Sequence, residues 1–165
     1  MRTLTMEQFF ESKWSNFPLM SSMLDFNIFM FVYRATNHAK VSFKKSFDDG
    51  GFYGTGKKWT SRKKNYPHPI LYETGDLKDL MSVSPVKKES NGRYKASIRT
   101  NETYGRRYGK KRAGYAAVHN DPTSGMTVNQ YSSAPPVKRQ FIGHNSKLYE
   151  EINRLYVPII LQNLM

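Results

Sequence analysis

The sequence reads Ile-Leu-Tyr-Glu-Thr-Gly-Asp-Leu-Lys-Asp-Leu-Met over residues 70–81, an apolar pair followed by a Thr-Gly break and a short amphipathic turn. The hydroxyl of Thr74 can accept a hydrogen bond from a backbone N–H as a helix cap, and Gly75 needs no room for a Cβ. Leu77, Leu80 and Met81 then follow at helical spacing. The pattern predicts a transition into a short helix that fixes how the preceding loop enters the sheet.

On the N-terminal side of this stretch, apolar residues recur every three or four positions between residues 19 and 47. The series is Leu24, Ile28, Phe31, Ala35, Ala39, Phe43 and Phe47. This period predicts a long helix, which Gly50 and Gly51 end. Residues 4–17 predict a short amphipathic helix that Pro18 ends, and its aromatic side chains suit either an assembly arm (residues 1–17) or core packing. Residues 48–69 predict a long loop anchored by Trp59.

On the C-terminal side, the sequence alternates over residues 82–88 and 93–100 around Asn91 and Gly92, which predicts an antiparallel hairpin. Pro85 cannot donate to a ladder, so the first strand is expected to be an edge strand or bulged there. Further elements follow: a basic loop at 101–114, a short apolar element at 115–119, a loop at 120–136 and a strand at 137–143. Asn145 or Ser146 is expected to cap a last helix, which Pro158 should kink or divide near Tyr156, leaving 156–165 as a tail.

Length and composition predict one domain over residues 1–165, because 38% apolar residues can form a single core. The absence of cysteine excludes disulfides, cysteine-ligated metals and thiol catalysis. No apolar run is long enough to span a membrane, and the first residues do not resemble a secretion signal. The net charge of +13 predicts attraction to polyanions such as nucleic acid or an acidic protein surface.

No pattern of catalytic residues emerges, and we expect neither an enzyme nor a bound cofactor or metal. Residues 51–58 resemble a phosphate-binding loop, but Lys58 stands where Ser or Thr should bind magnesium, and the segment follows a helix instead of a strand. The histidines lie far apart, and carboxylates form no recognisable pair. For His119, the interpretation as a packed or capping residue stands against that of a catalytic base.

The loop at 101–114 is the best candidate for contact with nucleic acid. Its cations are Arg106, Arg107, Lys110, Lys111 and Arg112, interleaved with tyrosines. Such cations can neutralise phosphates while tyrosines stack on bases, and the same loop could face an acidic protein partner or simply be solvated. No motif for reading base sequence is present.

Four segments in order resemble one family. They contain Trp59 after a Gly/Lys-rich loop; Leu71, Thr74, Gly75 and Leu77 in an I-L-x-x-T-G-x-L motif; Tyr115 and His119 in a Y-A-x-x-H element; and Phe141 and Gly143 in an R-x-F-I-G element. The chain resembles the virion morphogenesis and tail-completion proteins of tailed bacteriophages, the Mu-type family and its relatives. The resemblance covers about residues 20 to 155.

The resemblance implies a non-enzymatic α+β protomer, with a long N-terminal helix and a C-terminal helix packed on a small antiparallel sheet and with long basic loops. It implies a cyclic homo-oligomer of six or twelve copies in the virion neck. This ring would join portal, adaptor or head-closure proteins to tail tube or tail hub proteins. Its positive charge would suit non-specific contact with genomic DNA in the channel.

Two other classes remain open. The charge alone also fits a free nucleic-acid-binding protein of ribosomal or nucleoid type. A nuclease is a third possibility, with no catalytic motif to favour it.

Overall fold

The computed structural model of the 165-residue chain describes residues 17–62, 67, 69–71, 76–100, 115–122 and 136–162. The fold is α+β, with helices and two small antiparallel sheets. Predictions for residues 4–16, 72–75, 101–114 and 123–135 lie outside the described residues. None of the described helices combines the length and apolar character that a membrane crossing requires.

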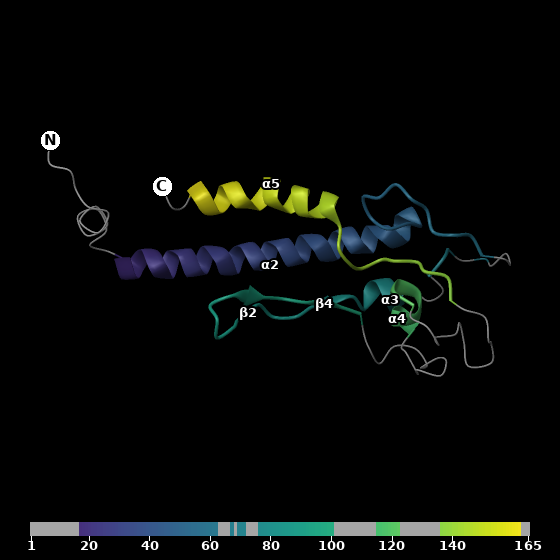
Figure 1. Cartoon of the computed structure of the whole chain (residues 1–165), viewed down its shortest axis with the longest axis horizontal. Helices are drawn as coiled ribbons and strands as arrows, with labels where there is room; N and C mark the ends of the chain where they lie inside the picture. Colours follow the sequence, from purple (N-terminus) through teal and green to yellow (C-terminus); the bar gives the residue numbers. More distant parts are fainter. Residues whose placement is uncertain are drawn as a thin grey trace.

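The elements form three layers (Figure 1). The central layer is α2 (Phe17–Asp49), and α5 (Ser146–Gln162) runs antiparallel along one side of it. The strands lie along the other side of α2 (Figure 1). The sequence predicts that both helices pack on the sheet, whereas in the structure α5 packs on α2 and α2 separates it from the strands.

The ends of α2 follow from its proline and glycines. Pro18 does not end a helix but lies in the first turn of α2, where its missing N–H would have no helical partner anyway. At the other end, Gly50 adopts φ 61° and the N–H of Gly51 donates to the carbonyl of Ser46 at 3.0 Å. This is a Schellman cap. A Cβ on Gly51 would lie 2.2 Å from the Lys57 carbonyl oxygen, so the close return of the loop requires glycine there.

The predicted hairpin forms, but a bulge divides it into two short ladders. The strands are β1 (Ser82–Val83), β2 (Lys87–Lys88), β3 (Tyr94–Lys95) and β4 (Ile98–Arg99), with β1 paired to β4 and β2 to β3. Between the ladders, residues 84–86 oppose only residues 96–97, so the extra residue lies in the arm that contains Pro85. Of the two predicted alternatives at Pro85, an edge strand or a bulge, the structure shows the bulge.

Two hydrogen bonds hold the bulge, and a glycine turns the hairpin. Ser84 donates its N–H to the carbonyl of Ser97 at 2.8 Å, and the N–H of Ser97 donates to Oγ of Ser84 at 2.8 Å. At the turn, Gly92 adopts φ 79° and donates its N–H to the Glu89 carbonyl at 2.9 Å.

The predicted strand at 137–143 is not in a sheet. It lies extended beside α4 (Tyr115–Asn120), the helix formed by the short apolar element. Arg139 donates its N–H to the His119 carbonyl at 2.7 Å, and the N–H groups of Phe141 and Ile142 both donate to Oδ1 of Asn120 at 2.9 Å. The Asn120 side chain and the His119 carbonyl, at the C-terminal end of α4, thus accept the hydrogen bonds that a neighbouring strand would otherwise accept.

Of the two predicted caps of α5, Asn145 and Ser146, the structure shows Asn145. Its Oδ1 accepts the N–H of Leu148 at 3.0 Å, and its own Nδ2 donates to the Tyr53 carbonyl. The helix is not divided at Pro158 but continues to Gln162, so residues 156–162 are helix and not the predicted tail. Tyr156 holds this half on α2, since its hydroxyl lies 3.1 Å from Nδ1 of His38.

The core lies where the C-terminal half of α2 meets the first turns of α5. Its buried apolar members are Phe43, Phe47, Trp59, Leu71, Leu77, Met81, Phe141, Leu148 and Ile152. Phe52 and Tyr53 also pack against it, so Trp59 is not the only aromatic that anchors the loop at 48–69. Near the N-terminus of α2, by contrast, Leu24 is exposed although it belongs to the same helical series.

Candidate interaction surface

The apolar motif residues named from sequence converge in this core. Trp59, Leu71, Leu77 and Phe141 come from segments up to 82 positions apart and belong to one buried cluster. The indole Nε1 of Trp59 donates to the Gln140 carbonyl at 2.9 Å, and its ring lies edge-on to Phe47 at 5.7 Å between centroids. The Phe47 ring also contacts Phe141 at 5.1 Å. These motif residues therefore hold the fold together and face no open site.

Two motif residues, Leu71 and Gly143, have a positive backbone φ angle. Leu71 adopts φ 59° while its side chain is buried, an uncommon left-handed conformation for a leucine. Gly143 adopts φ 148°, and a Cβ there would lie 2.3 Å from Nε2 of Gln140. Tyr115 is the first residue of α4. Thr74 and Gly75 lie outside the described residues, and the predicted cap before α3 (Asp76–Asp79) stays a prediction.

His119 is buried in α4, which supports the packed interpretation over that of a catalytic base. Burial lowers the pKa of its imidazole from 6.5 to about 4, and the nearby Arg139 guanidinium acts in the same direction. The Arg139 side chain is buried as well and donates from Nη2 to the Thr60 carbonyl at 3.2 Å. A neutral His119 and a charged Arg139 thus join α4, the segment at 136–142 and the Trp59 loop.

The predicted contact loop with Arg106, Arg107, Lys110, Lys111 and Arg112 lies outside the described residues. Among the residues that are described, no group of three or more His, Asp or Glu side chains is placed to hold a metal ion. The described surface of the helices carries other features, which no sequence motif identifies.

Large apolar side chains are exposed along α2 and α5. On α2 these are Met23, Leu24, Phe26, Phe29, Tyr33 and Val41; on α5 they are Tyr149, Leu155, Ile159 and Leu161. Phe26 is 62% exposed and Val41 52%, values typical of solvated polar residues. Apolar surface that recurs along one pair of helices marks a candidate for contact with another protein.

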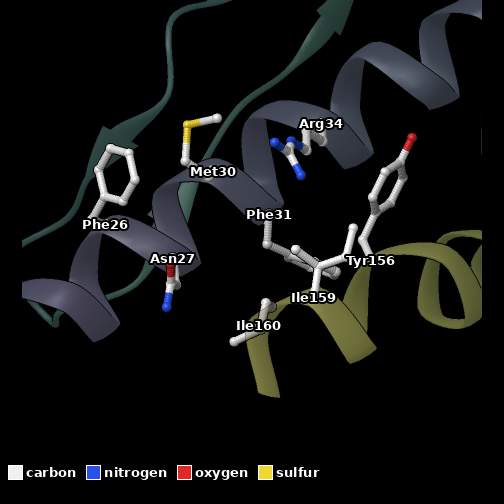
Figure 2. A pocket seen from close by; sticks show the side chains of 8 residues that line it. All are labelled: Phe26, Asn27, Met30, Phe31, Arg34, Tyr156, Ile159 and Ile160. Atoms are coloured by element: carbon white, nitrogen blue, oxygen red, sulfur yellow. The ribbon is translucent and has the colours of Figure 1, made fainter. Parts of the chain in front are cut away.

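A groove follows α2 beside α5, and Figure 2 shows its apolar part. Phe31 of α2 faces Ile159 of α5 across the seam between the helices, whereas Phe26 and Met30 point away from α5 (Figure 2). The volume of this part is about 210 Å³. It is lined by Phe26, Asn27, Met30, Phe31, Arg34, Tyr156, Ile159 and Ile160.

The groove continues toward the C-terminus of α2 as a wider, more polar hollow of about 590 Å³. Arg34 and Tyr156 line both parts, so the two parts are adjacent, and together they are named here the α2 groove. The polar part is lined by Tyr33, Arg34, Asn37, His38, Val41, Ser42, Lys45 and Tyr156. The α2 groove thus offers apolar contacts at one end and cationic ones at the other.

A polar network that includes His38 and Tyr156 of the groove lining joins α2 to α5. His38 lies 3.1 Å from the Tyr156 hydroxyl, and its Nε2 is 3.9 Å from Oε2 of Glu151. The Tyr53 hydroxyl donates to the same Glu151 oxygen at 2.9 Å. Burial and the neighbouring Glu151 raise the pKa of Tyr53. Sequence spacing gave no signal for this network, because its members lie up to 118 positions apart.

Comparisons of the chain with protein-family models, curated proteins and solved structures give no match.

Proposed function

We propose that this chain is a structural protein of the neck of a tailed bacteriophage, where it forms a ring between the portal or head-closure proteins and the tail. The observation that carries the proposal is the convergence of Trp59, Leu71, Leu77 and Phe141 in one core. The resemblance rests on four short motifs, and it is better supported when the apolar residues of these motifs pack together in one core. Here they fix the loop and helix ends around α2.

The exposed surfaces support an assembly role. Cyclic rings need two different complementary surfaces on each copy. The α2 groove with its apolar edge at Phe26 and Met30 offers one such surface, and the exposed side chains of α5, such as Leu155, offer another. In this proposal the ring contains six or twelve copies, and it is located in the virion.

Electron microscopy tests the proposal in two settings. The purified chain is imaged alone and together with the portal and adaptor proteins of the same phage, and purified virions are analysed for the chain by mass spectrometry. We expect a ring in at least one mixture and the chain in mature particles. Absence from particles, together with no ring in any mixture, would overturn the proposal.

The competing function, a free nucleic-acid-binding protein, predicts a different outcome. Such a protein would bind DNA tightly as a monomer, with a steep dependence on salt, and would be absent from virions. A ring that is present in virions decides for the neck, whatever its affinity for DNA.

A further inference from the structure

The hairpin of residues 82–100 has an inner face attached to α2. The Tyr94 ring meets Phe29 of α2 edge-on at 6.5 Å between centroids. Lys88 forms an ion pair with Asp25 of α2, and its ammonium lies 5.4 Å from the centre of the Tyr94 ring. Since neighbouring residues of a strand point to opposite sides, Lys87 and Lys95 must point outward, away from α2.

Two lysines stand directly opposite each other on the outer face. Lys87 and Lys95 are cross-strand partners in the β2–β3 ladder, and both are exposed. Like charges in this position destabilise a hairpin. Glu89, at 3.6 Å from Lys95, is the only acid in residues 82–100. No described acid lies within ion-pair distance of Lys87.

Arginines extend the charge along the same face. Arg93 and Arg99 are exposed and share the outward alternation of Lys95, whereas Ile98 packs against the core. From Arg93 to Arg99 the strand covers about 20 Å. The hairpin contributes no large apolar residue to the exposed surface of the described chain. Figure 1 places the hairpin on the side of α2 opposite α5.

We propose that this outer face, formed by Lys87, Arg93, Lys95 and Arg99, binds the phosphate backbone of double-stranded DNA without reading its sequence. Phosphates would neutralise the opposed lysines, and phosphate contacts need only cations. A protein partner would instead need apolar anchors, which this face lacks. A single strand would need exposed aromatic rings, and Tyr94 lies on the inner face. The inference goes beyond the neck assembly and does not depend on it, because one copy carries the whole face.

The test compares two triple variants of the full chain with equal loss of charge. One is Lys87→Gln, Arg93→Gln and Lys95→Gln; the control is Lys57→Gln, Lys147→Gln and Arg154→Gln, three exposed cations away from the hairpin. The probes are a labelled DNA duplex of about 20 base pairs, longer than the face, one of its single strands, and poly-glutamate. Affinity is measured by fluorescence anisotropy at several salt concentrations, with the melting temperature as a check of folding.

We expect the hairpin variant to lose at least tenfold in affinity for the duplex. Its salt slope should fall by about 2.7, because each lost phosphate contact contributes about 0.9. The control variant should lose less than about threefold. Equal losses in both variants, no loss in the hairpin variant, tighter binding of the single strand, or an effect on poly-glutamate alone would each overturn the proposal.

The single variant Lys87→Glu gives an independent test, since it replaces the opposed like charges with an attractive pair. It should raise the melting temperature by about 1–3 °C while it weakens duplex binding. A purely structural hairpin would show no loss of DNA affinity in this variant. Unchanged affinity, or a melting temperature that does not rise, contradicts the inference.

Discussion

Burial and the neighbouring Arg139 guanidinium both lower the pKa of the His119 imidazole. Both favour the neutral ring, so the pKa of His119 in the folded chain is about 4 instead of 6.5. The unfolded chain therefore binds a proton more readily than the folded one. Stability from this group is fully present above pH 6.5 and is lost as the pH falls from 6.5 toward 4.

This difference predicts a measurable loss of stability in mild acid. Between pH 7 and pH 4.5, protonation linked to His119 should lower the free energy of unfolding by about 2 kcal/mol. The measurement is urea denaturation at both pH values for the wild type and for His119→Gln, in which this part of the pH dependence should disappear. The same substitution at the exposed His144 should retain it. Identical pH dependence in the wild type and His119→Gln would contradict the prediction.

Among the elements, α5 depends on a single capping side chain. Asn145 is buried and bonds both the N–H of Leu148 in α5 and the Tyr53 carbonyl in the preceding loop. Asn145→Ala should lower stability by about 1–2 kcal/mol, which corresponds to about 2–8 °C in the melting temperature. Thermal unfolding followed by circular dichroism measures this shift.

Ser146→Ala is the matched control, because Ser146 is exposed and is the alternative cap that the sequence suggested. It should change stability by less than about 0.5 kcal/mol. A larger effect at Ser146 than at Asn145 would show that the cap is assigned to the wrong residue.

The sequence predicts the end of an element correctly where residues close to that end determine it. The glycine pair after α2, the Asn-Gly turn of the hairpin and the cap of α5 each act through residues a few positions apart. The sequence predicts a strand at 137–143, whereas the structure has this segment outside any sheet. Its backbone N–H groups donate to His119 and Asn120 of α4, and no local sequence pattern identifies those partners.

The sequence predicts that Pro158 kinks or divides the last helix, but α5 continues past Pro158 to Gln162. A proline in a helix interior removes one backbone hydrogen bond. The contact between Tyr156 and His38 of α2, which lie 118 positions apart in the sequence, nevertheless holds this half of α5 against α2. Tertiary contacts of this kind override a local preference. The layer order has the same origin, since periodicity reveals that a helix has an apolar face but not which element covers it.

For the whole molecule, α2 packs into the core at its C-terminal half and exposes large apolar side chains at its N-terminal half. Phe26→Ser changes a side chain that is 62% exposed, so the melting temperature should stay within about 2 °C of the wild type. If this surface joins copies or neck proteins, the change should weaken association at least tenfold, as expected for the loss of an aromatic anchor. Sedimentation at increasing protein concentration and incorporation into virions measure the effect.

Leu80→Ser serves as the control, because Leu80 is also exposed but lies after α3, outside the groove. It should leave association unchanged. If Phe26→Ser assembles like the wild type, or if both variants fail equally, the α2 groove is not the contact surface.

The length of α2 has a mechanical consequence. A helix of 33 residues is a rod of about 50 Å, and the stretch from Phe26 in the groove to Phe47 in the core measures about 32 Å of it. Because α5 braces this rod along one side, the rod resists bending, and the distance between its two ends is set by residue count. A partner bound at Phe26, in the apolar part of the α2 groove, is therefore held at a constant spacing from Phe47 in the core, and the number of residues between them sets that spacing.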